Sequence, residues 1–167
     1  MGNNIICFHS PREEYGWLSN WYYSDFVVGG TKYSSMEQYM MHCKAMLFGD
    51  QATAEKIMAT RDVAVIKRLG REVTPFDANS WSTFGLLYVT DGLYAKYSQN
   101  SSLLSWLLMT GDAILVECAV KDHIWACGRD MTDPRRLDPS KWDGKNRLGF
   151  ATMFVREKLR ANGYLPF

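Results

Sequence analysis

The chain has 167 residues, of which 47% are hydrophobic and 22% are charged. This composition excludes a disordered protein, and the length fits one domain with its own apolar core. The formal net charge is +1, from 19 basic and 18 acidic side chains. Such a balance gives no overall field to attract a polyanion, so non-specific nucleic-acid binding is not expected.

The four cysteines are scattered, and none forms a C-x-x-C pair. This spacing predicts free thiols in a reducing compartment and no metal site. The first ten residues lack a basic start with a long apolar core, and no apolar run approaches the ~20 residues that span a bilayer. We therefore expect a cytoplasmic protein without a membrane anchor.

The first half of the chain predicts a strand, a hairpin and three helices. Residues 4–8 are β-prone, and Gly29-Gly30 separates two β-prone runs within residues 24–34, a pattern typical of a hairpin. Apolar residues at helical spacing then predict a helix from Ser34 to the glycine at position 49. Two short helices are expected over 51–60 and 63–71, each after an aspartate that can cap it.

The second half predicts three more helices and one strand. A long helix is expected over 77–98, a shorter one over about 100–109, and a strand over 113–120. Residues 126–144 form the longest predicted loop, and a helix follows over about 147–161, with an inward face formed by Leu148, Met153, Phe154 and Leu159. The fold class predicted is a helix-dominated α+β single domain over residues 1–167, with a small antiparallel β-sheet.

A carboxylate and an amine, Glu37 and Lys44, stand in the apolar stretch SSMEQYMMHCKAMLFGD. Seven residues turn a helix through nearly two revolutions, so both side chains lie on one side of the first helix. Two structural interpretations compete with a chemical one. Ser34 and Glu37 match a capping box, and Lys44 can extend along an apolar face to reach water. If both groups line a cleft instead, their proton affinities shift and they can act as acid, base or nucleophile.

The order of several motifs resembles the NADAR (YbiA-like) family. The motifs are GWLSNWYYSDFVVGGTKYSSMEQYMMHCKAMLFGD, IKRLGREV, LLMTGDAILVECAVKDHIWACG and KWDGKNRLGFATMFVREKLR. They cover nearly the whole chain. The resemblance implies an N-glycosidase that needs no cofactor and acts on a phosphorylated ribosyl compound. It implies Glu37 and Lys44 as catalytic residues, and substrate contacts from Asn20, Trp21, Trp125, Asn146 and Arg147.

Substrate identity is left between two chemistries. The resemblance includes enzymes that remove ADP-ribose from guanine in modified nucleic acid and enzymes that cleave early riboflavin-pathway intermediates. Members of the second kind often carry Asp where this chain has Cys127, which favours ADP-ribose on guanine here. A module that binds ADP-ribose or NAD without cleaving it is the alternative from another class.

Physical roles follow for the remaining residues. Trp21 and Trp125 can offer flat surfaces for a base, and Gly144 precedes a helix whose first amides suit a phosphate. Lys145 and Arg147 can add positive charge there. Glu37 can stabilise the positive charge that develops on the sugar or activate water. Lys44 is expected either to attack the anomeric carbon or to hold substrate by its charge.

Overall fold

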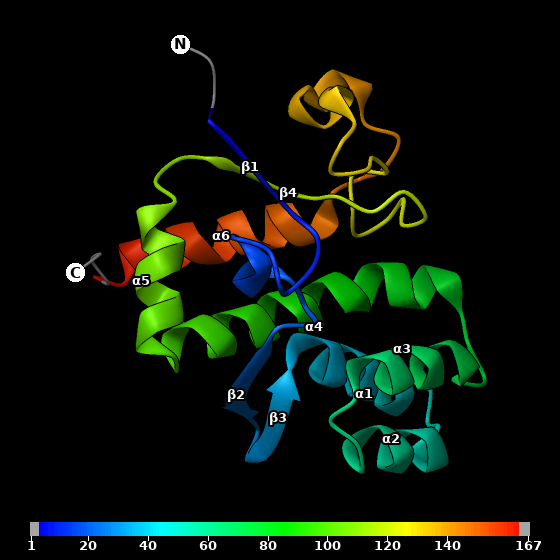
Figure 1. Ribbon diagram of the computed structural model, residues 1–167. Helices are drawn as coiled ribbons and strands as arrows, with labels where there is room; N and C mark the ends of the chain where they lie inside the picture. The colour runs from blue at the N-terminus through cyan, green and yellow to red at the C-terminus, as the bar shows by residue number, and fades with distance from the viewer. Residues whose placement is uncertain (1–3, 164–167) are drawn as a thin grey trace. The chain divides into compact units, whose positions relative to one another are not determined.

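The computed structural model describes residues 4–163 of the chain (Figure 1). These residues divide into two compact units, one formed by residues 20–100 and the other by residues 4–19 and 101–163. The fold is helix-dominated α+β and contains the small antiparallel sheet that the sequence predicts. The organisation as a single domain stays a prediction.

The unit of residues 20–100 begins with the predicted hairpin. Strand β2 (Tyr23–Val28) pairs antiparallel with β3 (Thr31–Ser35). Gly29 and Gly30 connect them with φ angles of 56° and 80°, the positive values that a two-residue hairpin turn requires. Helix α1 (Met36–Leu47) follows β3 directly.

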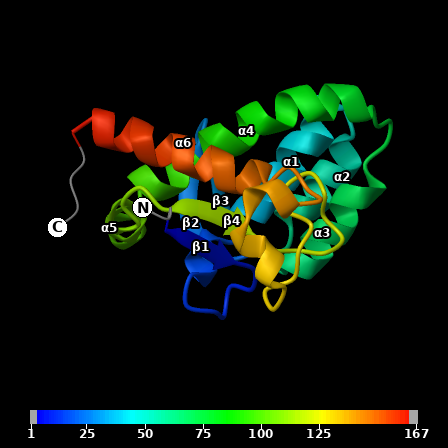
Figure 2. The same cartoon turned by 90° about the horizontal axis from the view of Figure 1, so that it is seen from above.

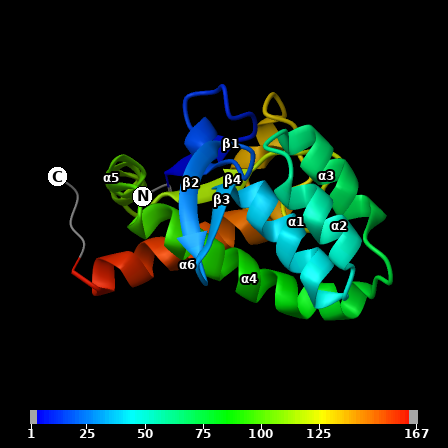
Figure 3. The same cartoon turned by 90° about the horizontal axis from the view of Figure 1, so that it is seen from below.

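Helix α1 is the centre of this unit. It packs against α2 (Gln51–Met58), α3 (Val63–Glu72) and α4 (Ala78–Ser98), and α1, α2 and α3 lie side by side in Figure 3. Glycines allow this close approach. A Cβ atom at Gly70 of α3 would lie 2.0 Å from the Met41 sulfur, and one at Gly92 of α4 would lie 2.4 Å from the Tyr39 ring. Gly92 therefore weakens α4 locally but lets it contact α1 directly.

The other unit contains a parallel pair of strands that the sequence did not predict. Strand β1 (Ile5–Phe8) pairs parallel with β4 (Ile114–Glu117), and α6 (Arg147–Ala161) packs against β4, as Figure 2 shows. The remaining regular elements of this unit are η1 (Gly16–Leu18), α5 (Ser101–Met109), η2 (Pro134–Leu137) and η3 (Pro139–Lys141). The two 3-10 turns lie inside the predicted 126–144 loop.

Two details differ from the expectation. The strand predicted over 113–120 ends at Glu117, because its partner β1 ends at Phe8, whose carbonyl accepts the last ladder bond from the Cys118 amide. In α6, Leu148 and Leu159 are fully buried as predicted, but the Phe154 side chain is 60% exposed. The buried stripe of α6 instead includes Val155.

Candidate active site

The start of α1 leaves Glu37 outside the capping interactions. The N-cap is Ser35, whose Oγ accepts a hydrogen bond from the Gln38 amide at 3.2 Å. The Gln38 Oε1 atom in turn accepts bonds from the amide and hydroxyl of Ser34 at 2.8 and 3.0 Å. The structural interpretation in which Ser34 and Glu37 form a capping box is therefore wrong, because Gln38, one residue later, bonds to Ser34 instead.

Glu37 is instead a buried carboxylate with a cationic neighbour. Its side chain is 2% exposed, and Lys67 Nζ of α3 lies 3.5 Å from Glu37 Oε1. The Glu37 amide donates a hydrogen bond to the Asn20 backbone carbonyl at 2.9 Å, which fixes Asn20 next to Glu37. A buried carboxylate is costly unless a cation or hydrogen bonds compensate it. Lys67 supplies part of that compensation.

Asn20 carries an unused acceptor. The side chain is 7% exposed, and its Nδ2 atom contacts the Met40 sulfur at 3.8 Å. Within residues 4–163, its Oδ1 atom is buried and accepts no hydrogen bond. A buried acceptor without a donor is unfavourable, so this atom is a candidate to receive a bond from a substrate hydroxyl. The neighbouring Trp21 is partly buried.

Lys44 lies one to two turns further along α1 in a partly apolar environment. Its Nζ atom donates to the Gly70 carbonyl at 2.6 Å and sits 4.3 Å from the centre of the Phe76 ring. Burial lowers the pKa of the Lys44 ammonium, and the Lys67 charge lowers it further, while the Glu37 carboxylate opposes both. The lower pKa raises the fraction of neutral, nucleophilic amine at a given pH.

Lys67 is the residue of this cluster that sequence reasoning missed. It follows Ile66, which is fully buried on the apolar face of α3, so its position predicts only a helix-edge lysine. The motif IKRLGREV contains it, but nothing in the local pattern pairs it with a carboxylate on another helix. The packing of α3 against α1 creates that pair.

The predicted site residues near the start of α6 belong to the other unit and have mainly structural contacts there. Asn146 is fully buried with φ 47° and ψ 39°, and its side chain accepts from the Glu117 amide at 3.0 Å and donates to the Leu115 carbonyl at 2.9 Å. Both groups hold β4, and the side chain has no exposed surface through which a substrate could reach it. We therefore leave Asn146 out of the proposed substrate site.

The amides at the start of α6 are also occupied. Those of Arg147 and Leu148 donate to the carbonyls of Ile124 and Trp125 at 3.2 and 3.0 Å. This overturns the expectation that they point outwards to a phosphate, because the returning loop supplies their acceptors. A Cβ atom at Gly144 would lie 2.3 Å from the Ala126 carbonyl oxygen, so this glycine serves close backbone packing.

The other predicted contact residues in this unit are Trp125, Lys145 and Arg147. Trp125 is 9% exposed, and its amide donates to the Asp122 carboxylate at 2.8 Å. Lys145 is exposed and Arg147 is partly buried. Their roles toward a substrate stay predictions. Among residues 4–163, no group of three or more His, Cys, Asp or Glu side chains is placed to hold a metal ion.

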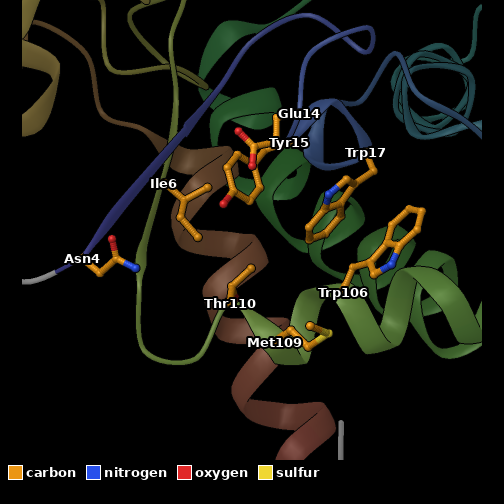
Figure 4. Close-up of a pocket in the computed structure, with 8 residues that line it drawn as sticks. All are labelled: Asn4, Ile6, Glu14, Tyr15, Trp17, Trp106, Met109 and Thr110. Carbon is orange, nitrogen blue, oxygen red and sulfur yellow. The ribbon is translucent and has the colours of Figure 1, made fainter. Parts of the chain in front are cut away.

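An aromatic pocket of about 440 Å³ lies in the unit of β1 and α5 (Figure 4). Trp17 and Trp106 face each other on one side, with ring centres 5.9 Å apart. The other residues that line it are Asn4, Ile6, Glu14, Tyr15, Met109 and Thr110. None of the predicted catalytic or substrate residues lines this pocket.

Comparison with known proteins identifies the class to which this fold and cluster belong. Residues 7–160 match the NADAR domain family. The chain is 38% identical over 164 residues to N-glycosidase R617 of Acanthamoeba polyphaga mimivirus, covering 93% of this chain and 96% of that protein. It is 30% identical over 159 residues to N-glycosidase YbiA of Escherichia coli, covering 95% and 91% of the two chains.

A solved structure and a longer relative extend the comparison. The NMR structure of Escherichia coli YbiA matches with a TM-score of 0.80 and 30% identity, covering 98% of this chain and 89% of that one. Riboflavin biosynthesis protein VVA0006 of Vibrio vulnificus is 33% identical over 155 residues, which are 93% of this chain but 38% of that protein. The chain therefore belongs to the NADAR domain family. Within it, the chain is an enzyme of the YbiA-like N-glycosidase type.

No helix within residues 4–163 is both long and apolar enough to cross a membrane.

Proposed function

We propose that Glu37, Lys44 and Lys67 form the catalytic centre, and that it removes ADP-ribose from guanine by hydrolysing the bond between the ribose C1 and the base nitrogen. The observation that carries the proposal is the buried Glu37 carboxylate with the Lys67 ammonium at 3.5 Å and an amine of lowered pKa on the same helix. Buried charges cost stability, so a group of ionisable side chains that act on one another's charge is a candidate functional site.

Each group has a role that its surroundings support. Breaking a glycosidic bond builds positive charge on the sugar, and the Glu37 carboxylate can stabilise that charge at close range because little water screens it. The neutral Lys44 amine can attack C1 while the base departs with the bonding electrons. The C1–O bond of the ring then breaks, the ring oxygen takes the remaining N–H proton, and the opened sugar is held as a Schiff base, which water hydrolyses to free the amine. The side-chain oxygen of Asn20, Oδ1, can accept a hydrogen bond from a ribose hydroxyl.

An electrostatic role for Lys44 competes with the covalent one, and reductive trapping separates them. Borohydride added during turnover should fix a sugar-derived mass on Lys44, located by peptide mapping. Lys44→Arg keeps the charge but has no nucleophilic amine, so it should lose both the adduct and activity. If Lys44→Arg retains activity and no adduct forms, the covalent role is wrong and the charge alone matters.

The substrate is tested by release of free base. The chain is incubated separately with ADP-ribosylated guanosine and with the early riboflavin-pathway intermediates, and products are measured by mass spectrometry. Riboflavin intermediates are the second candidate because a relative is named as a riboflavin biosynthesis protein. ADP-ribose on guanine is the first candidate because the buried Cys127 thiol supplies no carboxylate at the position where riboflavin-type members often carry Asp.

A non-catalytic module is the third possible result. It would bind ADP-ribose in a calorimetric titration yet release no base from either substrate. Glu37→Gln is the matched control for turnover, because it keeps the size of the side chain and removes only the charge. Base release by the wild type that Glu37→Gln abolishes supports the enzyme, whereas binding without release supports the module.

A further inference from the structure

Three of the four cysteines converge in the unit of β1, β4 and α6, although they are far apart in sequence. Cys118 and Cys127 are 1% and 0% exposed, and their sulfur atoms are 3.9 Å apart. They form an apolar cluster with Val116, and Cys7 of β1 packs against it. Cys43 lies in α1 and belongs to the other unit.

Cys7 connects this cluster to the protein surface. It is partly exposed and lines a pocket of about 300 Å³ in the same unit. Arg136 lines that pocket as well, and its Nε atom is buried without a hydrogen-bond partner in the described part of the chain. Two carboxylates, Glu13 and Glu14, also line it. A volume of about 300 Å³ has room for a molecule as small as hydrogen peroxide beside Cys7.

The three thiols differ in the charge that their surroundings favour. The hydrogen bond from the Cys118 thiol lowers the pKa of Cys7 against the effect of burial, and the Arg136 charge lowers it further. The contact with the Cys118 sulfur, 3.9 Å away, together with nearby backbone groups, lowers the pKa of Cys127 to about 7. The pKa of Cys118 itself is raised, so this central thiol stays protonated between two thiols that tend toward thiolate. Thiolates are the reactive form toward peroxide and disulfides.

We propose that Cys7, Cys118 and Cys127 form an oxidation site, in which a peroxide reacts at Cys7 and the final product is a buried disulfide between Cys118 and Cys127. This site is separate from the proposed catalytic centre, since none of its three thiols takes part in the glycosidase chemistry.

The steps balance with hydrogen peroxide as the only oxidant. The Cys7 thiolate attacks one peroxide oxygen, the O–O bond breaks, and Cys7 sulfenic acid and hydroxide form. The Cys118 thiol gives its proton to that hydroxide to form water, and its sulfur then displaces the sulfenic oxygen as hydroxide, giving a Cys7–Cys118 disulfide. Finally the Cys127 thiolate attacks the Cys118 sulfur and releases Cys7 as thiolate. In total, two thiol sulfurs are oxidised by one electron each, and the peroxide takes both electrons.

Each variant should stop this sequence at a different species. The reduced chain is treated with hydrogen peroxide, quenched with N-ethylmaleimide at successive times, and mapped after trypsin digestion, which places the four cysteines in different peptides. The wild type should lose two alkylated thiols and gain a Cys118–Cys127 linkage that dithiothreitol reverses. Cys127→Ser should stop at the Cys7–Cys118 disulfide, and Cys118→Ser at Cys7 sulfenic acid, which dimedone labels.

Two further variants test the entry point. Cys43→Ser is the matched control and should behave as the wild type. Arg136→Gln should slow the first step by up to about tenfold, the effect of one pKa unit on the thiolate fraction. Because Cys118→Ser and Cys127→Ser change buried side chains, their thermal unfolding is measured first, and Cys7→Ser gives the independent test at a partly exposed position.

Two results would overturn the proposal. One is a Cys7→Ser variant that forms the Cys118–Cys127 disulfide as fast as the wild type, since peroxide would then reach the buried pair without Cys7. The other is a wild-type chain in which Cys43 is oxidised first or no linkage to Cys118 forms.

Discussion

Replacing Lys67 by methionine tests whether the cation beside Glu37 holds the carboxylate in place. Methionine keeps much of the apolar stem of lysine and removes only the ammonium, so most packing on α3 is preserved. The variant leaves the Glu37 carboxylate, which is 2% exposed, without the ion pair at 3.5 Å. We expect the free energy of unfolding to fall.

The size of the effect follows from the geometry. Two unit charges 3.5 Å apart attract by about 1 kcal/mol at the dielectric constant of water and about 5 kcal/mol at an effective value of ~20. Lys67 is 32% exposed while Glu37 is nearly covered, so the pair lies between these limits. We expect a coupling of about 2 kcal/mol, which is more than an exposed ion pair supplies and less than a fully buried one.

A double-mutant cycle measures this coupling directly. Urea unfolding is followed by circular dichroism for wild type, Lys67→Met, Glu37→Gln and the double variant at one pH and ionic strength. Arg68→Met is the matched control on the same helix, because Arg68 pairs with the exposed Glu72. It should cost less than about 0.5 kcal/mol. If the two single effects add to within about 0.5 kcal/mol, Lys67 does not stabilise the Glu37 carboxylate and the electrostatic picture of the site is wrong.

Three further predictions concern groups that support the fold. Lys96 has no exposed surface, and burial lowers its pKa to about 7 from 10.5. Between those pH values the unfolded state binds more protons, so the free energy of unfolding should rise with pH. Lys96→Met should flatten this rise in urea titrations, and an unchanged dependence on pH would contradict the prediction. Gln38→Ala should cost about 2–4 kcal/mol in thermal unfolding, because it breaks buried hydrogen bonds to three residues, whereas Gln51→Ala at an exposed position should cost under about 0.5. Asn146→Gly should lower the free energy of unfolding by about 2 kcal/mol, because two hydrogen bonds are lost. Asn146→Ala should lower it by about 1 kcal/mol more, because alanine is strained in the left-handed backbone conformation. Equal costs for the two variants would show that the backbone angle matters little.

Local signals predicted most elements because their causes are local. Asp50, Asp62 and Asp77 each cap the helix that follows, as the sequence indicates, since an N-cap needs only the amides two or three residues ahead. The Gly29-Gly30 turn is equally local. The parallel pairing of β1 with β4 was not predicted, because two distant short strands can meet in either direction and nothing nearby in the sequence decides between them.

The candidate site was predictable only where its residues share one helix. Helical periodicity places Glu37 and Lys44 on one side of α1, but Lys67 joins them only through the packing of α3. Asn146 was predicted as a substrate contact from the family resemblance alone. Its left-handed backbone turns the side chain onto β4, where it bonds to the Glu117 amide and the Leu115 carbonyl, and no local pattern in the sequence indicates that contact.

At the start of α1, the residue that stabilises the helix by hydrogen bonds, Gln38, is different from the residue that carries the buried charge, Glu37. Had Glu37 closed a capping box, its oxygens would be held by the backbone at Ser34 and unavailable for chemistry. Gln38 bonds to Ser34 instead. Its Nε2 atom also donates to the carbonyls of Ile57 and Thr60 at 3.2 and 2.9 Å, so an uncharged side chain fixes α1 to the end of α2. The carboxylate is then opposed by a lysine on α3 that remains one-third exposed. Such a cation can move away when a positively charged sugar forms, because its long side chain loses little packing in doing so. The start of α1 is thus stabilised by neutral groups, while the buried charge belongs to a different residue.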